Sequence, residues 1–157
     1  MVEYLEDCSE KICGPNKTVE IDESMFGRRK YNRGPPVKGQ WAFRGVERES
    51  GRTFLVPVPD RTADTLMTVI DACIEPGTTV ISDSWAAYRD LDAQGYTHRT
   101  VNRTIPFVNE EGDHTITIES KWGHVKAYLK SYKRSDDYIY HFAHYMFAAR
   151  CKAEGVN

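Results

Sequence analysis

The stretch Lys17-Thr18-Val19-Glu20-Ile21-Asp22-Glu23-Ser24 alternates apolar and polar side chains with the two-residue period of a β-strand. Val19 and Ile21 fall on one face of this strand, and Glu20 and Asp22 fall on the other. A strand interior disfavours aspartate, so an aspartate at such a place is typical of a strand end or of a site. We therefore expect a half-buried strand that carries the Asp22 carboxylate out of a core.

The composition predicts an ordinary intracellular globular domain. The chain has 157 residues, of which 40% are hydrophobic and 28% charged, and no linker or repeat divides it. We expect one domain over residues 17–157, preceded by an N-terminal extension, 1–16, to which we assign no chemistry. No apolar run approaches the roughly twenty residues of a membrane span, and the polar start does not resemble a signal peptide. Four scattered cysteines indicate reduced thiols. The expected compartment is the cytoplasm at the nucleoid in a bacterium, or the nucleus in a eukaryote.

Outside the Asp22 strand, periodicity and turn signals predict a series of further elements. Ser50-Gly51 lies between two strand-like runs, which indicates a hairpin. Thr62 can cap a helix that ends before Pro76-Gly77. The expected elements are strands at 41–47, 53–58, 79–82 and 96–102, a short helix at 84–91, and helices at 118–129 and 135–149. This order predicts an α/β protein of the ribonuclease-H-like type, in which three antiparallel strands and then parallel strands form a five-stranded mixed sheet flanked by helices.

Three carboxylates stand at positions where this topology would bring them together. Asp83 directly follows the fourth strand, and a parallel pairing of that strand with the first would place Asp83 beside Asp22. Glu119 lies on a late helix that can approach both. Converging carboxylates repel one another unless a cation lies between them, and Mg²⁺ or Mn²⁺ accepts oxygen ligands. Two such ions would suit an in-line phosphoryl transfer.

Two basic groups are candidates for binding nucleic acid, although the net charge is −2. The first group comprises Arg28, Arg29, Lys30 and Arg33. In the second group, Lys126 follows Glu119 by seven residues, close to two helical turns, so that it projects on the same side, and Lys130 continues this stripe. The alternative interpretation is that both groups are solvated faces.

Several motifs in order carry a resemblance to a known family. They are 18–34 (Thr-Val-Glu-Ile-Asp-Glu-Ser-Met-Phe-Gly-Arg-Arg-Lys-Tyr-Asn-Arg-Gly), 58–61 (Val-Pro-Asp-Arg), 81–88 (Ile-Ser-Asp-Ser-Trp-Ala-Ala-Tyr), 95–102 (Gly-Tyr-Thr-His-Arg-Thr-Val-Asn) and 114–126, which begins His-Thr-Ile-Thr-Ile-Glu-Ser-Lys-Trp. From about Lys17 to about Arg150 the chain resembles the catalytic domain of Merlin-type DDE transposases and their bacterial, ISXO2-like insertion-sequence relatives.

This resemblance implies a ribonuclease-H-like fold and a cut-and-paste DNA transposase. It implies that the triad maps onto Asp22, Asp83 and Glu119, with Lys126 at the family's trailing lysine. It also implies Mg²⁺, or Mn²⁺, as cofactor, with two ions, and double-stranded DNA as partner, both transposon ends and target. The implied reaction is hydrolysis of a phosphodiester followed by attack of the freed 3′ hydroxyl on target DNA.

Two other functions remain open. One is a shortened or host-adopted domain that binds or assembles DNA without cutting it, which is favoured because the resemblance does not include the upstream zinc-ribbon or helix-turn-helix region of such proteins. The other is a different ribonuclease-H-like nuclease, which would share the metals and differ in substrate. The chain departs from the family pattern at Arg44, where relatives often have Gly, at Arg103 and at Ile116.

Aromatic residues and histidines outside the triad have simpler interpretations. His98 is interpreted as a structural histidine. Trp85 and Trp122 could stack on an unpaired base, but their helical spacing with Tyr88 and Val125 favours core packing. The last predicted helix carries aromatic residues around much of its circumference, which would suit a homodimer contact. These residues are Tyr138, Tyr140, Phe142, Tyr145 and Phe147.

Overall fold

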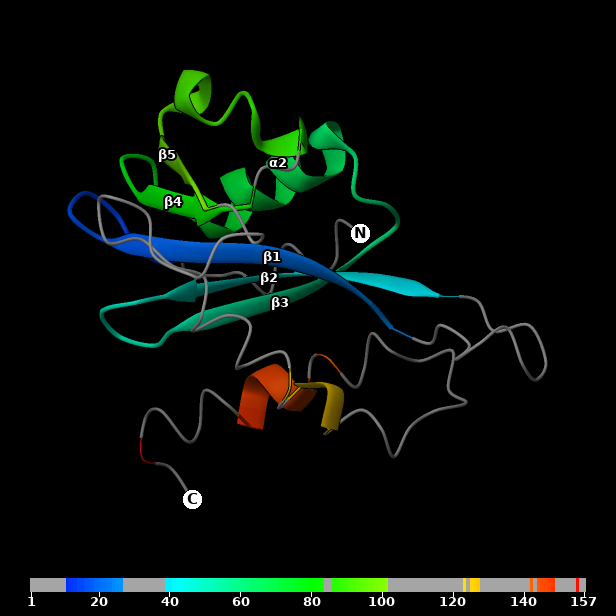
Figure 1. Cartoon of the computed structure of the whole chain (residues 1–157). Helices are drawn as coiled ribbons and strands as arrows, with labels where there is room; N and C mark the ends of the chain where they lie inside the picture. Colours follow the sequence, from blue (N-terminus) through cyan, green and yellow to red (C-terminus); the bar gives the residue numbers. More distant parts are fainter. Residues whose placement is uncertain are drawn as a thin grey trace.

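The computed structural model describes residues 11–26, 39–83, 86–101, 123, 125–127, 142, 144–148 and 155. Five strands in these ranges form one sheet in the order β3-β2-β1-β4-β5 (Figure 1). They are β1 (Thr18–Phe26), β2 (Gln40–Glu47), β3 (Thr53–Val58), β4 (Thr79–Ser82) and β5 (Thr97–Thr100). The pairs β1–β2 and β2–β3 are antiparallel, whereas β1–β4 and β4–β5 are parallel. The predicted five-stranded mixed sheet is confirmed, with the Asp22 strand at its centre.

The hairpin between β2 and β3 turns where the sequence predicts. The Gly51 amide donates to the Glu47 carbonyl at 2.9 Å, and the Glu47 amide donates to the Arg52 carbonyl at 2.8 Å. Gly51 has a φ of 74°, a conformation that glycine adopts without a steric cost. The turn chemistry therefore fixes the register of β2 against β3, and through β2 the register of β1.

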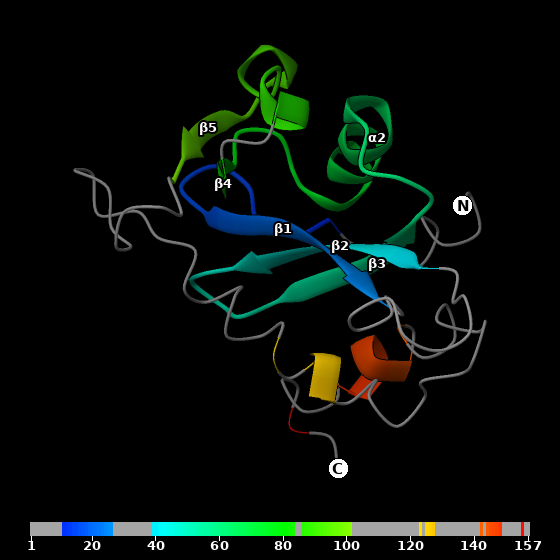
Figure 2. The same ribbon diagram turned by 45° about the vertical axis from the view of Figure 1, so that its right-hand side comes forward.

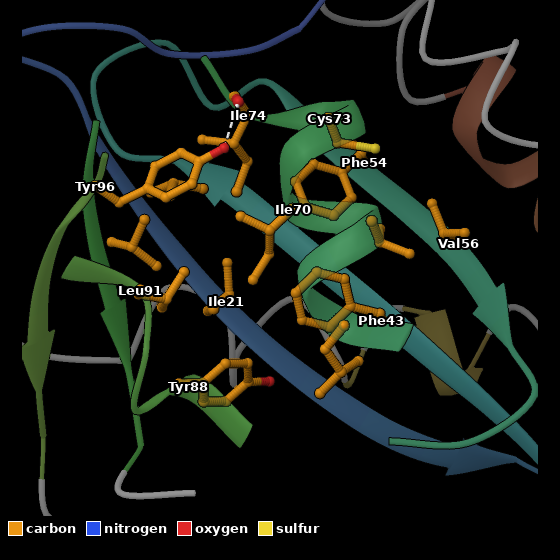
Figure 3. Packing of buried hydrophobic residues seen from close by; sticks show 14 of the residues in the cluster. Ile21, Phe43, Phe54, Val56, Ile70, Cys73, Ile74, Tyr88, Leu91 and Tyr96 are labelled. Atoms are coloured by element: carbon orange, nitrogen blue, oxygen red, sulfur yellow. Dashed lines mark hydrogen bonds between the residues drawn. The ribbon is translucent and has the colours of Figure 1, made fainter. Parts of the chain in front are cut away.

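Helix α2 (Ala63–Cys73) covers one face of the sheet (Figure 1). Thr62 caps it, because its side chain accepts a hydrogen bond from the Thr65 amide, as predicted. The buried stripe of the helix consists of Leu66, Val69, Ile70 and Cys73. These side chains pack on Ile21, Phe43 and Phe54 of the sheet, and Tyr88 closes one end of the cluster (Figure 3). One face of β1 therefore belongs to a dry core.

The other face of the sheet is covered by helical residues from the C-terminal third of the chain (Figure 2). Val125 and Phe142 pack against Phe26 and its neighbours on this face, and the Phe26 and Phe142 rings meet edge to face with centroids 5.3 Å apart. Phe142 is therefore a core residue, and Tyr145 is half-buried. Among the aromatic residues expected at a dimer contact, Phe147 is 67% exposed. β1 is therefore covered on both faces and is not the half-buried strand that the alternation predicted, because Glu20 and Asp22 on its polar face are buried as well.

The segment between β4 and β5 differs from the predicted short helix at 84–91. Its described residues form two 3₁₀ turns, η2 (Ala86–Tyr88) and η3 (Asp92–Gln94), and Gly95 ends the second with a φ of 94°. Ile12, in the N-terminal extension, joins the core through a parallel bridge to Ile74. Among the described residues, no helix combines the length and apolar character that crossing a bilayer requires.

Candidate active site

Asp22, in the middle of β1, and Asp83, directly after β4, come together where the parallel pairing of these two strands ends. The register of β1 on β4 pairs Glu20 with Ile81, so two residues farther along each strand the chain reaches Asp22 and Asp83. Carboxylate oxygens of these two residues, with one from Glu23, all lie within 4.8 Å of one another. The side-by-side placement that the sequence predicts for the two aspartates is therefore present in the fold.

Glu23 is the residue of this group that the sequence analysis did not single out. The Tyr88 hydroxyl donates a hydrogen bond of 2.5 Å to Glu23 Oε2. Arg61 Nη1 lies 3.4 Å from Glu23 Oε1, and the Arg61 guanidinium lies over the Trp41 ring, 4.8 Å from its centroid. The signal in the sequence was the position of Glu23 directly beside Asp22, in a motif that carries the family resemblance.

The three carboxylates make a strongly negative environment. Burial raises the pKa of Glu23, the hydrogen bond from Tyr88 lowers it, and the charges of Asp22 and Asp83 raise it again, so that the pKa lies above its ordinary value. Burial and then the charge of Glu23 raise the pKa of Tyr88 well above its usual range. Tyr88 therefore stays protonated and remains a hydrogen-bond donor to Glu23.

The donor set of this cluster fits a hard divalent cation. All three groups are carboxylates, and Mg²⁺ and Mn²⁺ prefer oxygen ligands of this kind. The mutual proximity of negative charges is costly without a positive partner, and a divalent ion would offset that cost. Asp22 and Asp83 thus lie close enough together to bind one cation, and Glu23 lies beside them.

Asp22 lies on the sheet face opposite α2, next to a buried arginine. Its Oδ1 accepts a hydrogen bond of 2.9 Å from the Glu23 amide. Arg44 is the cross-strand partner of Asp22, and only 1% of its surface is exposed. Arg44 Nε donates to Thr53 Oγ1 at 3.2 Å, and its guanidinium lies over the Tyr145 ring, 5.8 Å from the centroid. Arg44 therefore places a buried cation on the same face as Asp22.

The backbone of Asp83 is held from β5. Ser82 Oγ donates to the Asp83 carbonyl at 2.8 Å and lies 2.6 Å from His98 Nε2. The Val101 amide donates to the Ser82 carbonyl at 2.9 Å. Burial lowers the pKa of His98, which favours the neutral ring. His98 thus helps to hold the end of β4, directly before Asp83, and this agrees with the structural role predicted for it.

Several predicted site residues lie outside the described residues. They are Glu119, Arg28, Arg29, Lys30, Arg33 and Lys130. Lys126 is described and exposed, on the helical residues 125–127 that cover the face of the sheet carrying Asp22. Its neighbour Val125 is fully buried in that layer. The structure therefore brings Asp22 and Asp83 together and places Lys126 at the surface.

Comparison with known proteins agrees with this geometry. The catalytic core domain of BIV integrase superposes with a TM-score of 0.53 at 16% identity, covering 80% of this chain and 78% of that one. A chain of the simian T-cell lymphotropic virus intasome in complex with the PP2A regulatory subunit B56 gamma gives 0.50 at 18% identity, covering 78% of this chain and 43% of that one. At such identities the likeness shows the fold alone, which is ribonuclease-H-like, as predicted.

Sequence comparison identifies the family. An uncharacterized transposase-like protein of Haemophilus influenzae is 26% identical over 81 residues, which make up 52% of this chain. The match spans 65% of that relative's length, slightly less than two thirds. The model of the ISXO2-like transposase domain matches residues 16–149, most of the chain. The chain therefore belongs to the ISXO2-like transposase domain family.

Proposed function

We propose that this domain is a metal-dependent polynucleotidyl transferase that cuts and joins DNA at transposon ends, with Asp22, Asp83 and Glu119 as its catalytic carboxylates. The observation that carries the proposal is the convergence of Asp22, in the middle of β1, and Asp83, directly after β4. It is supported by membership of a transposase family and by a fold shared with an integrase catalytic core.

The cofactor that we propose is Mg²⁺ or Mn²⁺, as a pair of ions. When bound, such ions act as Lewis acids on phosphoryl oxygens and stabilise the attacking and leaving oxygens of an in-line displacement. Asp22, Asp83 and Glu119 would hold these ions. The carboxylates alone would repel a DNA phosphate, so DNA binding at this site depends on the cations.

Double-stranded DNA is the partner that we propose, both transposon ends and target. Lys126 is exposed on the layer that covers the Asp22 face, where it could hold a phosphate near the carboxylates. Arg28, Arg29, Lys30 and Arg33, together with Lys130, are proposed to bind the DNA backbone. A homodimer contact, in which the exposed Phe147 would take part, stays a prediction.

The test is nicking of supercoiled plasmid DNA in Mg²⁺ or Mn²⁺. The wild type should nick, and Asp22→Asn, Asp83→Asn and Glu119→Gln should each reduce nicking to background while preserving the circular dichroism spectrum. Glu75→Gln is the matched control, because Glu75 is an exposed acid that is not part of the cluster. Equal nicking by the wild type and all three carboxylate variants would refute the assignment.

The buried Arg44 favours a second function, a domain that binds DNA without cutting it. Cross-strand neighbours lie close together, so Arg44 brings a fixed positive charge to the Asp22 face that could take the place of a metal ion. This alternative predicts salt-sensitive DNA binding that is lost when Arg28, Arg29 and Lys30 are changed to Gln. It also predicts that the triad variants bind DNA as the wild type does and that none of the proteins nicks.

A further inference from the structure

Glu23 occupies an unusual place for a charged side chain. It lies on the same face of β1 as Ile21, toward the apolar cluster under α2, and its side chain is only 3% exposed. A carboxylate in such surroundings loses its hydration, which is costly unless specific partners or a cation replace the water. Packing alone therefore does not account for a carboxylate at this position.

Two residues from different elements hold the Glu23 carboxylate. Tyr88, from η2, donates to Oε2 at 2.5 Å, and the Tyr88 ring is fully buried at the end of the core (Figure 3). Arg61, from the loop before α2, approaches Oε1 at 3.4 Å while its guanidinium rests on the Trp41 ring. The orientation of the carboxylate is thus fixed by a rigid core residue on one side and a stacked arginine on the other.

These anchors do not by themselves neutralise the cluster. Arg61 supplies one positive charge near three carboxylates, its side chain is 39% exposed, and a contact of 3.4 Å is long for a charge-assisted hydrogen bond. An ionised carboxylate has about four lone-pair sites, so accepting Tyr88 and Arg61 leaves room for a further partner. A Glu23 oxygen lies within 4.8 Å of ligand atoms of both Asp22 and Asp83, which is where that partner would sit.

We propose that Glu23 is an additional carboxylate ligand of the cation site formed by Asp22 and Asp83, and that Tyr88 and Arg61 are positioning residues that hold it there. This inference rests on the proposed function, because it assigns Glu23 to the same site. β1 then contributes two successive ligands, Asp22 and Glu23, one from each of its faces. Because Tyr88 is a core residue of η2 and holds Glu23, the packing of η2 would affect the affinity for the cation.

The test is titration of the purified full chain with Mn²⁺ alone, without DNA, with free Mn²⁺ followed by electron paramagnetic resonance. Glu23→Gln should weaken Mn²⁺ binding about tenfold or more. Tyr88→Phe, which keeps the buried ring, should weaken it by a factor of about ten, as loss of a hydrogen bond to a ligand does. Glu75→Gln should bind as the wild type does, and Asp22→Asn should lose binding.

The outcomes separate this inference from the proposed function. Loss of affinity in Asp22→Asn and Asp83→Asn, with wild-type affinity in both Glu23→Gln and Tyr88→Phe, would overturn the role of Glu23 and leave the proposed site intact. No Mn²⁺ binding by the wild type would overturn both. If Glu23→Gln does not fold, Tyr88→Phe decides, because wild-type affinity in that folded variant would contradict the positioning role.

Discussion

Asp22→Asn should stabilise the protein in the absence of divalent cations. In the wild type, oxygens of Asp22, Glu23 and Asp83 lie within 4.8 Å of one another. Two unit charges at that distance repel by about 3 kcal/mol at an effective dielectric of about 20 and by about 1 kcal/mol in bulk water. Asp22 takes part in two such pairs, and an asparagine Oδ1 can still accept the hydrogen bond from the Glu23 amide. An intermediate value of about 2 kcal/mol per pair gives a repulsion of about 4 kcal/mol for the two pairs. The other interactions of the Asp22 carboxylate, including the attraction to the cross-strand neighbour Arg44, are lost at a cost of about 2–3 kcal/mol, so the expected net gain is about 1–2 kcal/mol.

The assay is thermal and urea unfolding near neutral pH with EDTA, in which a gain of this size raises the Tm by about 2–8 °C. Millimolar Mn²⁺ should then stabilise the wild type and leave Asp22→Asn unchanged. The advantage of the variant should shrink as the pH falls toward about 4, since Glu23, whose pKa is raised, takes up a proton before an ordinary glutamate would, and the repulsion ends. A variant less stable than the wild type in EDTA would refute this reasoning, as would a gain that is equally large in acid.

Three further predictions concern the scaffold. Gly45→Ala should lower stability by about 1–3 kcal/mol in urea unfolding, because the added Cβ would clash with the Phe54 ring, and an unchanged midpoint would contradict this packing. Burial lowers the pKa of His98, so its contribution to stability is present above about pH 6.5 and is lost as the pH falls through the folded pKa. His98→Gln should therefore flatten the stability profile between about pH 7 and 5, and parallel profiles would argue against it. Burial, followed by the charge of Glu47, raises the pKa of Cys13 to about 12. The Cys13 thiol of the folded protein should therefore react with a disulfide reagent near pH 8 far more slowly than that of the protein unfolded in urea, and equal rates would contradict its burial.

The sheet and the pairing of the aspartates could be predicted because their determinants are local. The alternation around Val19 and Ile21 fixes which face of β1 packs in the apolar cluster under α2. The cap at Thr62 and the turn at Gly51 set where α2 and the hairpin begin and end. Once β1 and β4 pair in parallel, their register aligns Asp22 with Asp83, and the side-by-side placement follows from the topology.

The role of Glu23 could not be predicted from the same pattern. Strand alternation assigns Glu23 to the face opposite Asp22, where it would be separate from the site. One of its oxygens nevertheless lies within 4.8 Å of oxygens of both aspartates, and its partner Tyr88 is 65 residues away in the sequence. The spacing of Tyr88 with Trp85 and Leu91 predicted a short helix, but spacing carries no information about where the Tyr88 hydroxyl lies.

The burial of Arg44 could not be predicted from the sequence either. An arginine in a strand is ordinarily expected at the surface. Here the side chain is covered because the C-terminal helical residues pack over β2. Its Nε donates a hydrogen bond to Thr53, and its guanidinium lies over the Tyr145 ring. The arginine at this position is thus accommodated by tertiary contacts that no local signal predicts.

The most direct test of the metal site is an anomalous diffraction experiment on crystals soaked in Mn²⁺. The account predicts an anomalous peak within bonding distance of carboxylate oxygens of both Asp22 and Asp83. The absence of any peak at these residues in crystals saturated with Mn²⁺ would contradict it.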